Sequence, residues 1–265
     1  MSPPRAPVGS AARRLVAGLA ALASVVPLLV KVGGDEPTVW IPAVFLLVAA
    51  VVVHVPRLGL QLLARAGWWS NLALGMILTL MGSDGELRSG ASLAVGCGVA
   101  LLVAGPGLAA ASERDGFAPA QSRTALLVLM VLALADAQTF ALFGAIEDHP
   151  AGFVLLALAA AYVGGFVGLV RLAAWGPVVT TATSVVALVV FGLRLVRVDK
   201  DFVPVIVALA SLQILAGGTV LLAAVRGRPL LPPLPARLRG RAGVAVIALL
   251  LALAFLRLAG VIPRL

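Results

Sequence analysis

The chain has 265 residues, of which 62% are hydrophobic and 12% are charged, and its formal net charge at pH 7 is +9. A soluble domain is about 45–50% apolar and about 25% charged, so this composition excludes an ordinary soluble protein. The apolar residues form runs of roughly 20, the length that crosses a hydrocarbon core. Basic residues collect in the cytoplasmic loops of membrane proteins, so the net charge indicates membrane topology and no nucleic acid is expected as a partner.

The chain begins with a polar, basic segment, residues 1–14, which we expect to be a flexible cytoplasmic tail. The first apolar run is Leu15–Val32, and many runs follow it, so we interpret it as an uncleaved span rather than a signal peptide. Eight more spans are predicted in chain order: Val39–Val55, Gly67–Met81, Ala91–Ala111, Thr124–Ile146, Ala151–Trp175, Pro177–Leu193, Val203–Val225 and Gly243–Val261. The predicted fold is an all-α, polytopic transmembrane helical bundle of about nine spans in a single membrane domain, residues 1–265. The count becomes eight if the short Gly67–Met81 run does not cross.

Tryptophan and proline positions refine these spans. All four tryptophans fall near predicted span ends, where amphipathic rings prefer the headgroup region: Trp40, Trp68, Trp69 and Trp175. Pro27 lies deep within the first predicted span and Pro106 within the fourth, and we expect both to kink their helices.

The charged residues fall unequally on the two sides of the predicted bundle. Thirteen of the 20 lysines and arginines lie in the N-terminal tail or in loops on the same side, whereas eight of the 11 acidic residues lie on the other side. Lysine and arginine are enriched in cytoplasmic loops, so we predict a cytoplasmic N-terminus in the cell (inner) membrane. With nine spans, the C-terminus is outside.

The longest predicted loop, Arg226–Ala242, contains five arginines and four prolines. We expect an extended cytoplasmic segment that contacts anionic lipid headgroups of the bilayer. Proline-rich segments also bind proteins, so residues 226–242 are a candidate docking site for a protein partner.

Some features recur about 112 residues apart. Asp35-Glu36 corresponds to Glu147-Asp148, and Ala104-Gly105 corresponds to Ala216-Gly217. Chance similarity between runs rich in Leu, Ala and Val is the simpler explanation of this spacing. The alternative is a tandem 4+4 duplication in one orientation, with an appended ninth span. Parallel repeats occur in transporters, whose substrate site lies between the halves.

Asp136 lies at the middle of Thr124–Ile146 and is the one acidic residue that obeys no side preference and lies in no loop. A carboxylate at the centre of a span costs about 2.5–3.5 kcal/mol on insertion scales, so we expect it to face the bundle interior. There it either carries a proton or cation along a pathway or, when protonated, bonds to a neighbouring helix. Thr139 and Phe140 share its helical face, whereas Gln138 points nearly the other way. The position 112 residues earlier is Ser24.

Other polar residues within predicted spans are candidates to join this acid. Ser211 and Gln213 lie in the eighth span, and Arg171, near the cytoplasmic end of the sixth, is a candidate for an ion pair with Asp136. The candidate intramembrane polar site comprises Asp136, Gln138, Thr139, Ser211 and Gln213. Four hydroxyl residues near the start of the seventh span are expected to bond to their own i−4 carbonyls: Thr180, Thr181, Thr183 and Ser184. Gly164 and Gly168 have the Gly-x-x-x-Gly spacing of packed membrane helices.

Enzyme signatures such as His-Glu-x-x-His, a P-loop or a nucleophile elbow do not occur, so we predict no catalytic residues, cofactor or metal. Cys97 is the only cysteine, which excludes disulfides within the chain. The sequence favours a small transporter or permease-like protein with Asp136 near its pathway. The second hypothesis is a non-catalytic membrane subunit or scaffold. The third is a lipid-modifying enzyme that uses outer-face residues Asp35, Glu36, Glu147, Asp148 and His149.

Overall fold

The computed structural model describes residues 9–27, 30, 37–55, 58–81, 84–114, 120–146, 151–171, 173–193, 203–226 and 236–263. Within these residues the chain is helical and contains no strand. The helices are α1 (Gly9–Ala23), α3 (Pro37–Val52), α4 (Leu58–Met81), α5 (Asp84–Arg114), α6 (Ala120–Ile146), α7 (Ala151–Val170), α8 (Trp175–Gly192), α9 (Val203–Arg226) and α10 (Ala236–Leu258).

Five of these helices are long and apolar enough to cross a membrane: α5, α7, α8, α9 and α10. Helices α3 and α6 contain shorter apolar stretches, Ala43–Val52 and Ala125–Ala141. The prediction of an all-α membrane-helix bundle is therefore confirmed, and the chain is an integral membrane protein. The count of nine spans and the cytoplasmic N-terminus stay predictions.

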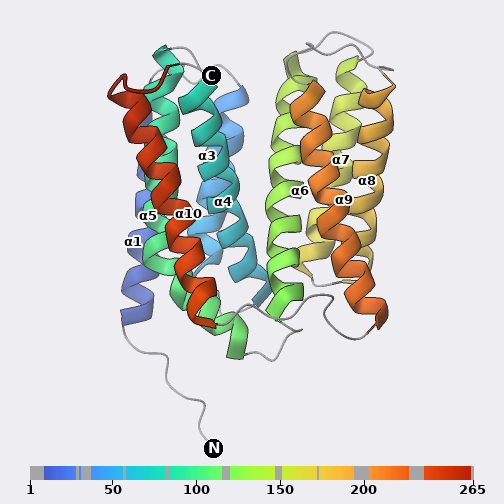
Figure 1. Cartoon of the computed structure of the whole chain (residues 1–265), viewed down its shortest axis with the longest axis horizontal. Helices are drawn as coiled ribbons and strands as arrows, with labels where there is room; N and C mark the ends of the chain where they lie inside the picture. Colours follow the sequence, from blue (N-terminus) through green and yellow to red (C-terminus); the bar gives the residue numbers. More distant parts are fainter. Residues whose placement is uncertain are drawn as a thin grey trace, which may run out of the picture. The chain divides into compact units, whose positions relative to one another are not determined.

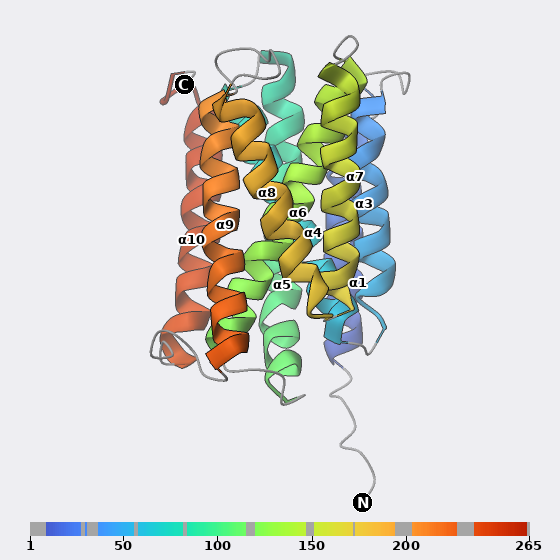
Figure 2. The ribbon, with the colours of Figure 1, turned by 90° about the vertical axis from the view of Figure 1, so that its right-hand side faces the viewer.

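The helices divide into two compact units. Unit 1 comprises residues 1–116 and 235–265 and contains α1, α3, α4, α5 and α10. Unit 2 comprises residues 117–234 and contains α6, α7, α8 and α9. Figures 1 and 2 show that the helices run alongside one another within each unit. The prediction of a single membrane domain over residues 1–265 stays a prediction.

In unit 1, four helices form a closed ring: α1 packs against α3 and α5, and α4 also packs against α3 and α5. The last helix, α10, lies against α5 and α4 on the outside of this ring (Figure 1). The contact between α4 and α5 is close, because a Cβ added to Gly75 would lie 2.6 Å from the backbone nitrogen of Ala94. The ring encloses an apolar core that includes Leu46, Trp68 and Leu93.

Unit 2 forms a second closed ring, in which α6 packs against α7, α7 against α8, α8 against α9, and α9 against α6. The α7–α8 contact depends on glycine, because a Cβ on Gly165 would lie 2.6 Å from Cγ2 of Thr180 and one on Gly168 would lie 2.7 Å from Cα of Gly176. A Cβ on Gly164 would meet nothing within 4 Å. The predicted pairing of Gly164 with Gly168 is therefore wrong for Gly164, and the adjacent Gly165 supplies the contact.

The two rings have the same order of neighbours along the chain, and α10 is an extra helix on unit 1. This is the organisation that a 4+4 duplication with one appended helix requires. Any up-and-down four-helix bundle with short connections has the same neighbours, however, so the duplication stays a prediction.

Three predicted boundaries differ from the structure. Helix α4 begins at Leu58 rather than Gly67, because residues 58–66 are mostly strong helix formers. The prediction began after Arg65 because a charged residue lowers the hydropathy there. Helix α1 begins at Gly9, so residues 9–14 of the predicted flexible tail are helical, and residues 1–8 lie outside the described residues. Helix α10 begins at Ala236, directly after the last proline of the predicted 226–242 loop. Residues 227–235 also lie outside the described residues, and partner docking there stays a prediction.

Two prolines and one tryptophan with predicted roles lie within the described helices or just after them. Helix α1 ends at Ala23 and is followed by a turn at Ser24 and Val25, because a proline at position 27 obstructs the carbonyl four residues earlier. The kink expected at Pro27 stays a prediction. Helix α5 continues through Pro106. Trp68 was expected near a membrane interface, but it is fully buried in the core of unit 1, because α4 begins about two and a half turns earlier than predicted.

Candidate intramembrane polar site

Asp136 projects from α6 into the centre of unit 2. Its exposed fraction is 4%, and its neighbours on the same face, Ala133, Ala137 and Phe140, are also buried. These residues recur at helical spacing of three and four, which turns one continuous face of α6 toward the other helices. Small alanines on either side of the acid let the neighbouring helices approach it.

Gln213 of α9 reaches Asp136 across the helix interface. With the amide nitrogen of Gln213 turned toward α6, Nε2 donates to Oδ2 of Asp136 and, at 3.2 Å, to Oγ of Ser184. In that orientation Oε1 accepts from the backbone nitrogen of Ala133 at 3.3 Å. The opposite orientation would place the amide oxygen against acceptors, so the surrounding groups determine the orientation of the amide.

Ser184 of α8 and Tyr162 of α7 complete the cluster. The Tyr162 hydroxyl donates to Oγ of Ser184 at 3.1 Å, and Ser184 donates to the carbonyl of Thr180 at 2.8 Å. The Tyr162 hydroxyl also neighbours the Asp136 carboxyl. Each helix of unit 2 therefore contributes one polar side chain, and we call Asp136, Tyr162, Ser184 and Gln213 the polar tetrad.

The tetrad lies near the middle of its helices. Tyr162 is the twelfth of 20 residues in α7, Ser184 the tenth of 18 in α8, and Gln213 the eleventh of 24 in α9. Asp136 is the seventeenth of 27 residues in α6. The cluster is thus about as far from both membrane surfaces as the helix lengths allow, where an unpaired polar group is most costly.

Aromatic rings cover one side of the tetrad. The ring of Phe140 stacks on that of Tyr162 with centroids 5.7 Å apart, and on that of Phe191 with centroids also 5.7 Å apart. Phe140 and Phe191 are at most 2% exposed. This stack holds the Tyr162 ring in place and makes the surroundings of its hydroxyl apolar.

The donor hydrogens of Gln213, Tyr162 and Ser184 all have acceptors in or next to the tetrad. The two amide hydrogens of Gln213 go to Asp136 and Ser184, the Tyr162 hydrogen goes to Ser184, and the Ser184 hydrogen goes to Thr180. Every hydrogen is then used, and the contact between Asp136 and Tyr162 lacks one unless the carboxyl carries a proton. The network is complete when Asp136 is protonated and donates to the Tyr162 oxygen.

The structure brings Gln213 against Asp136, but it separates the other sequence candidates from this contact. Ser211 donates to the carbonyl of Val207 within α9 at 2.7 Å. Gln138 is buried, although its position two residues after Asp136 places it on a different side of α6, and Thr139 is half-buried. Arg171 is exposed beyond the end of α7.

The hydroxyl prediction for α8 is confirmed. Thr180 donates to the carbonyl of Gly176 at 3.0 Å, Thr181 to that of Pro177 at 2.7 Å, and Thr183 to that of Val179 at 2.8 Å. Ser184 makes the same kind of bond and also accepts bonds from other helices, which the sequence prediction did not include.

Tyr162 was missed entirely by the sequence interpretation. It is the only tyrosine in the chain and lies at mid-span, whereas tyrosines in membrane proteins are enriched at the interfaces. That unusual depth is the signal that could have identified it.

No group of three or more His, Cys, Asp or Glu side chains able to hold a metal ion is found among the described residues. Cys97 is buried in unit 1 as a free thiol. The outer-face residues of the lipid-enzyme hypothesis, Asp35, Glu36, Glu147, Asp148 and His149, lie outside the described residues.

Comparison of the chain with protein-family models, with curated proteins and with solved structures finds no match.

Proposed function

We propose that the chain is a small transporter or permease-like membrane protein in which the Asp136 carboxyl exchanges protons. The observation that supports this role is the polar tetrad: the other three helices of unit 2 each contribute a polar side chain to a cluster around Asp136, near the middle of the helices. Intramembrane acids of this kind usually belong to ion or proton pathways.

The arrangement of bonds around Asp136 supports a closed state of such a pathway. A protonated Asp136 is satisfied by Tyr162 and Gln213, whereas release of its proton leaves a charge that needs new donors. The Tyr162 hydrogen is the nearest source, and its rotation toward Asp136 removes the bond that Tyr162 donates to Ser184. Loss of the proton thereby weakens the α7–α8 contact, which links the charge of Asp136 to helix packing.

The test uses the full chain reconstituted into liposomes that contain a trapped pH-sensitive dye. An imposed potassium diffusion potential should drive proton uptake into vesicles with the wild-type chain, and Asp136→Asn should reduce uptake to the level of empty vesicles. Ser211→Ala is the matched control, because Ser211 bonds only within α9 among the bonds described. Equal uptake by wild type and Asp136→Asn would remove Asp136 from the mechanism.

A second measurement does not depend on knowing a substrate. A protonated Asp136 has a carbonyl stretching band in the infrared that Asp136→Asn removes at neutral pH, where loop acids are ionised. A proton-exchanging group should shift this band soon after transfer of the wild-type protein into D₂O. A band that resists exchange for hours argues for a purely structural acid.

The completeness of the hydrogen-bond network favours a second candidate function, a non-catalytic membrane subunit or scaffold. In that role the tetrad ties four helices together and never opens, since each bond is already made. Slow infrared exchange, together with a second protein that co-purifies with the chain in mild detergent, is the result expected of this candidate.

A further inference from the structure

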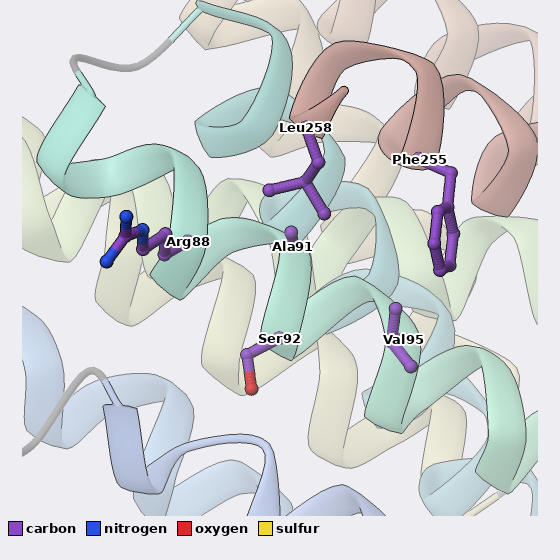
Figure 3. A pocket seen from close by; sticks show the side chains of 6 residues that line it. All are labelled: Arg88, Ala91, Ser92, Val95, Phe255 and Leu258. Carbon is purple, nitrogen blue, oxygen red and sulfur yellow. The ribbon is translucent and has the colours of Figure 1, made fainter. Parts of the chain in front are cut away.

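A groove of about 320 Å³ opens between α5 and α10 of unit 1 (Figure 3). Ala91, Ser92 and Val95 lie along its α5 side, and Phe255 and Leu258 project from α10. Arg88 is the sixth lining residue and the only charged one. The small residues on α5 create the space, and the larger side chains on α10 form its wall.

The groove follows α5 from Arg88 to Val95, a length of seven residues or about 10 Å at the rise of an α-helix. Beyond Val95, α5 and α10 are in contact, because a Cβ on Gly98 would lie 3.1 Å from Cδ2 of Leu251. Arg88 lies at the opposite end of the groove and is exposed, so the cation is at the end nearest the membrane surface.

Apart from Arg88, the lining offers little polarity to a ligand. Ser92 is its only hydroxyl, and that hydroxyl already donates to the carbonyl of Ser24 at 3.3 Å. An apolar channel with one cation at its surface end matches a lipid with an anionic headgroup, since the acyl chain fills the channel and the phosphate pairs with the guanidinium. A soluble anion would leave the apolar length unfilled.

We propose that this groove binds one anionic glycerophospholipid, with its headgroup at Arg88 and the upper part of an acyl chain between α5 and α10. The loop count predicts that Arg88 lies on the outer side, where basic residues are scarce, so the lipid belongs to that leaflet.

The unit contains a natural control for this site. A second groove, of about 180 Å³, lies between α1 and α3 and is lined by Leu15, Gly18, Leu19, Leu22, Leu47, Ala50, Val51 and His54. Its lining is also mostly apolar, with His54 as the one polar side chain, and it contains no arginine. Val51→Phe should fill this groove without affecting the α5–α10 groove.

The experiment is native mass spectrometry of the full chain, released from detergent with equal amounts of phosphatidylglycerol and phosphatidylcholine. Wild type should retain one phosphatidylglycerol in preference to phosphatidylcholine. Arg88→Gln should lower that preference about fivefold, which corresponds to about 1 kcal/mol for one basic residue. Val95→Phe should reduce binding of both lipids, while Val51→Phe should leave the preference unchanged.

Two results would overturn the proposal. One is equal retention of the two lipids by wild type, which means that Arg88 does not select charge. The other is an unchanged preference in Arg88→Gln, which places the anionic lipid elsewhere on the protein. Arg88 is exposed, so its substitution should not prevent folding, and the result remains interpretable even if Val95→Phe fails to fold.

Discussion

The two units have the same ring of four helices but different interiors. Subtraction of 112 from the tetrad positions gives Ser24, Ala50, Leu72 and Leu101, of which Leu72 and Leu101 are buried apolar side chains. Buried polar groups in unit 1 bond mainly to backbone: Asn71 donates to Gly67 at 2.8 Å and Thr79 to Gly75 at 2.6 Å. Unit 1 therefore closes its ring with leucine at the positions 112 residues before Ser184 and Gln213, so a four-helix ring does not require polar groups there.

This difference separates a structural from a functional account of the tetrad. Unit 1 has buried leucines 112 residues before Ser184 and Gln213. Helix packing alone therefore does not require polar side chains at these positions, whereas proton exchange would. Substitutions that place a polar group in unit 1, or remove one from unit 2, test this difference between the two interiors.

The largest effect is expected for Leu101→Gln in unit 1. Leu101 is 3% exposed in the core, and the new amide would lack the partners that Gln213 has in unit 2. Burial of an unbonded amide costs about 1–3 kcal/mol, and the lost apolar contact adds to that. We expect a loss of about 3 kcal/mol in the free energy of unfolding, measured by denaturant titration in mild detergent. Leu101→Met is the control, and a loss below about 1 kcal/mol would mean that unit 1 accommodates polar groups as well.

The second effect is that of Asp136→Leu in unit 2. This change leaves the amide of Gln213 and the hydroxyl of Tyr162 short of a partner, so we expect unfolding to become easier by about 2 kcal/mol. Asp136→Asn can donate to Tyr162 and accept from Gln213, as the protonated acid does, and should lose less than about 1 kcal/mol. Equal losses for the two variants, in the same titration, would contradict a protonated Asp136.

The third effect is that of Gln213→Leu, which gives unit 2 the residue found 112 positions earlier in unit 1, Leu101. The bonds from α9 to Asp136 and Ser184 disappear, but leucine restores apolar packing, and we expect a loss of about 1 kcal/mol. Ser211→Ala, two residues earlier on the same helix, should change stability by less than about 0.5 kcal/mol. A Gln213→Leu variant more stable than wild type would mean that the amide does not stabilise the fold and is present for function alone.

Residue chemistry alone identified part of the site. Asp136 and Gln213 stand out because a charge or an amide interrupts an apolar run, and such interruptions are visible without any structure. Ser184 and Tyr162 were not assigned to the site, because a hydroxyl can be satisfied by its own helix and tyrosine is compatible with a hydrophobic run. The ring order that brings α7 and α8 to Asp136 depends on contacts between different helices, such as Gly168 with Gly176 and Gln213 with Ala133, which periodicity within one helix does not encode.

The smallest effect, and the most specific, is expected for Tyr162→Phe. The phenylalanine keeps the stack on Phe140 and removes only the hydroxyl, so the stability loss should be near the average of about 0.6 kcal/mol for a hydrogen bond between membrane helices. The informative measurement is the infrared carbonyl band of Asp136. With its acceptor gone, the carboxyl hydrogen is no longer bonded to Tyr162 and the band should move to higher frequency, while Thr183→Val, which affects only a bond within α8, should leave it in place. An unmoved band in Tyr162→Phe would mean that the proton of Asp136 is bonded elsewhere, and the link between the acid and the α7–α8 contact would be lost.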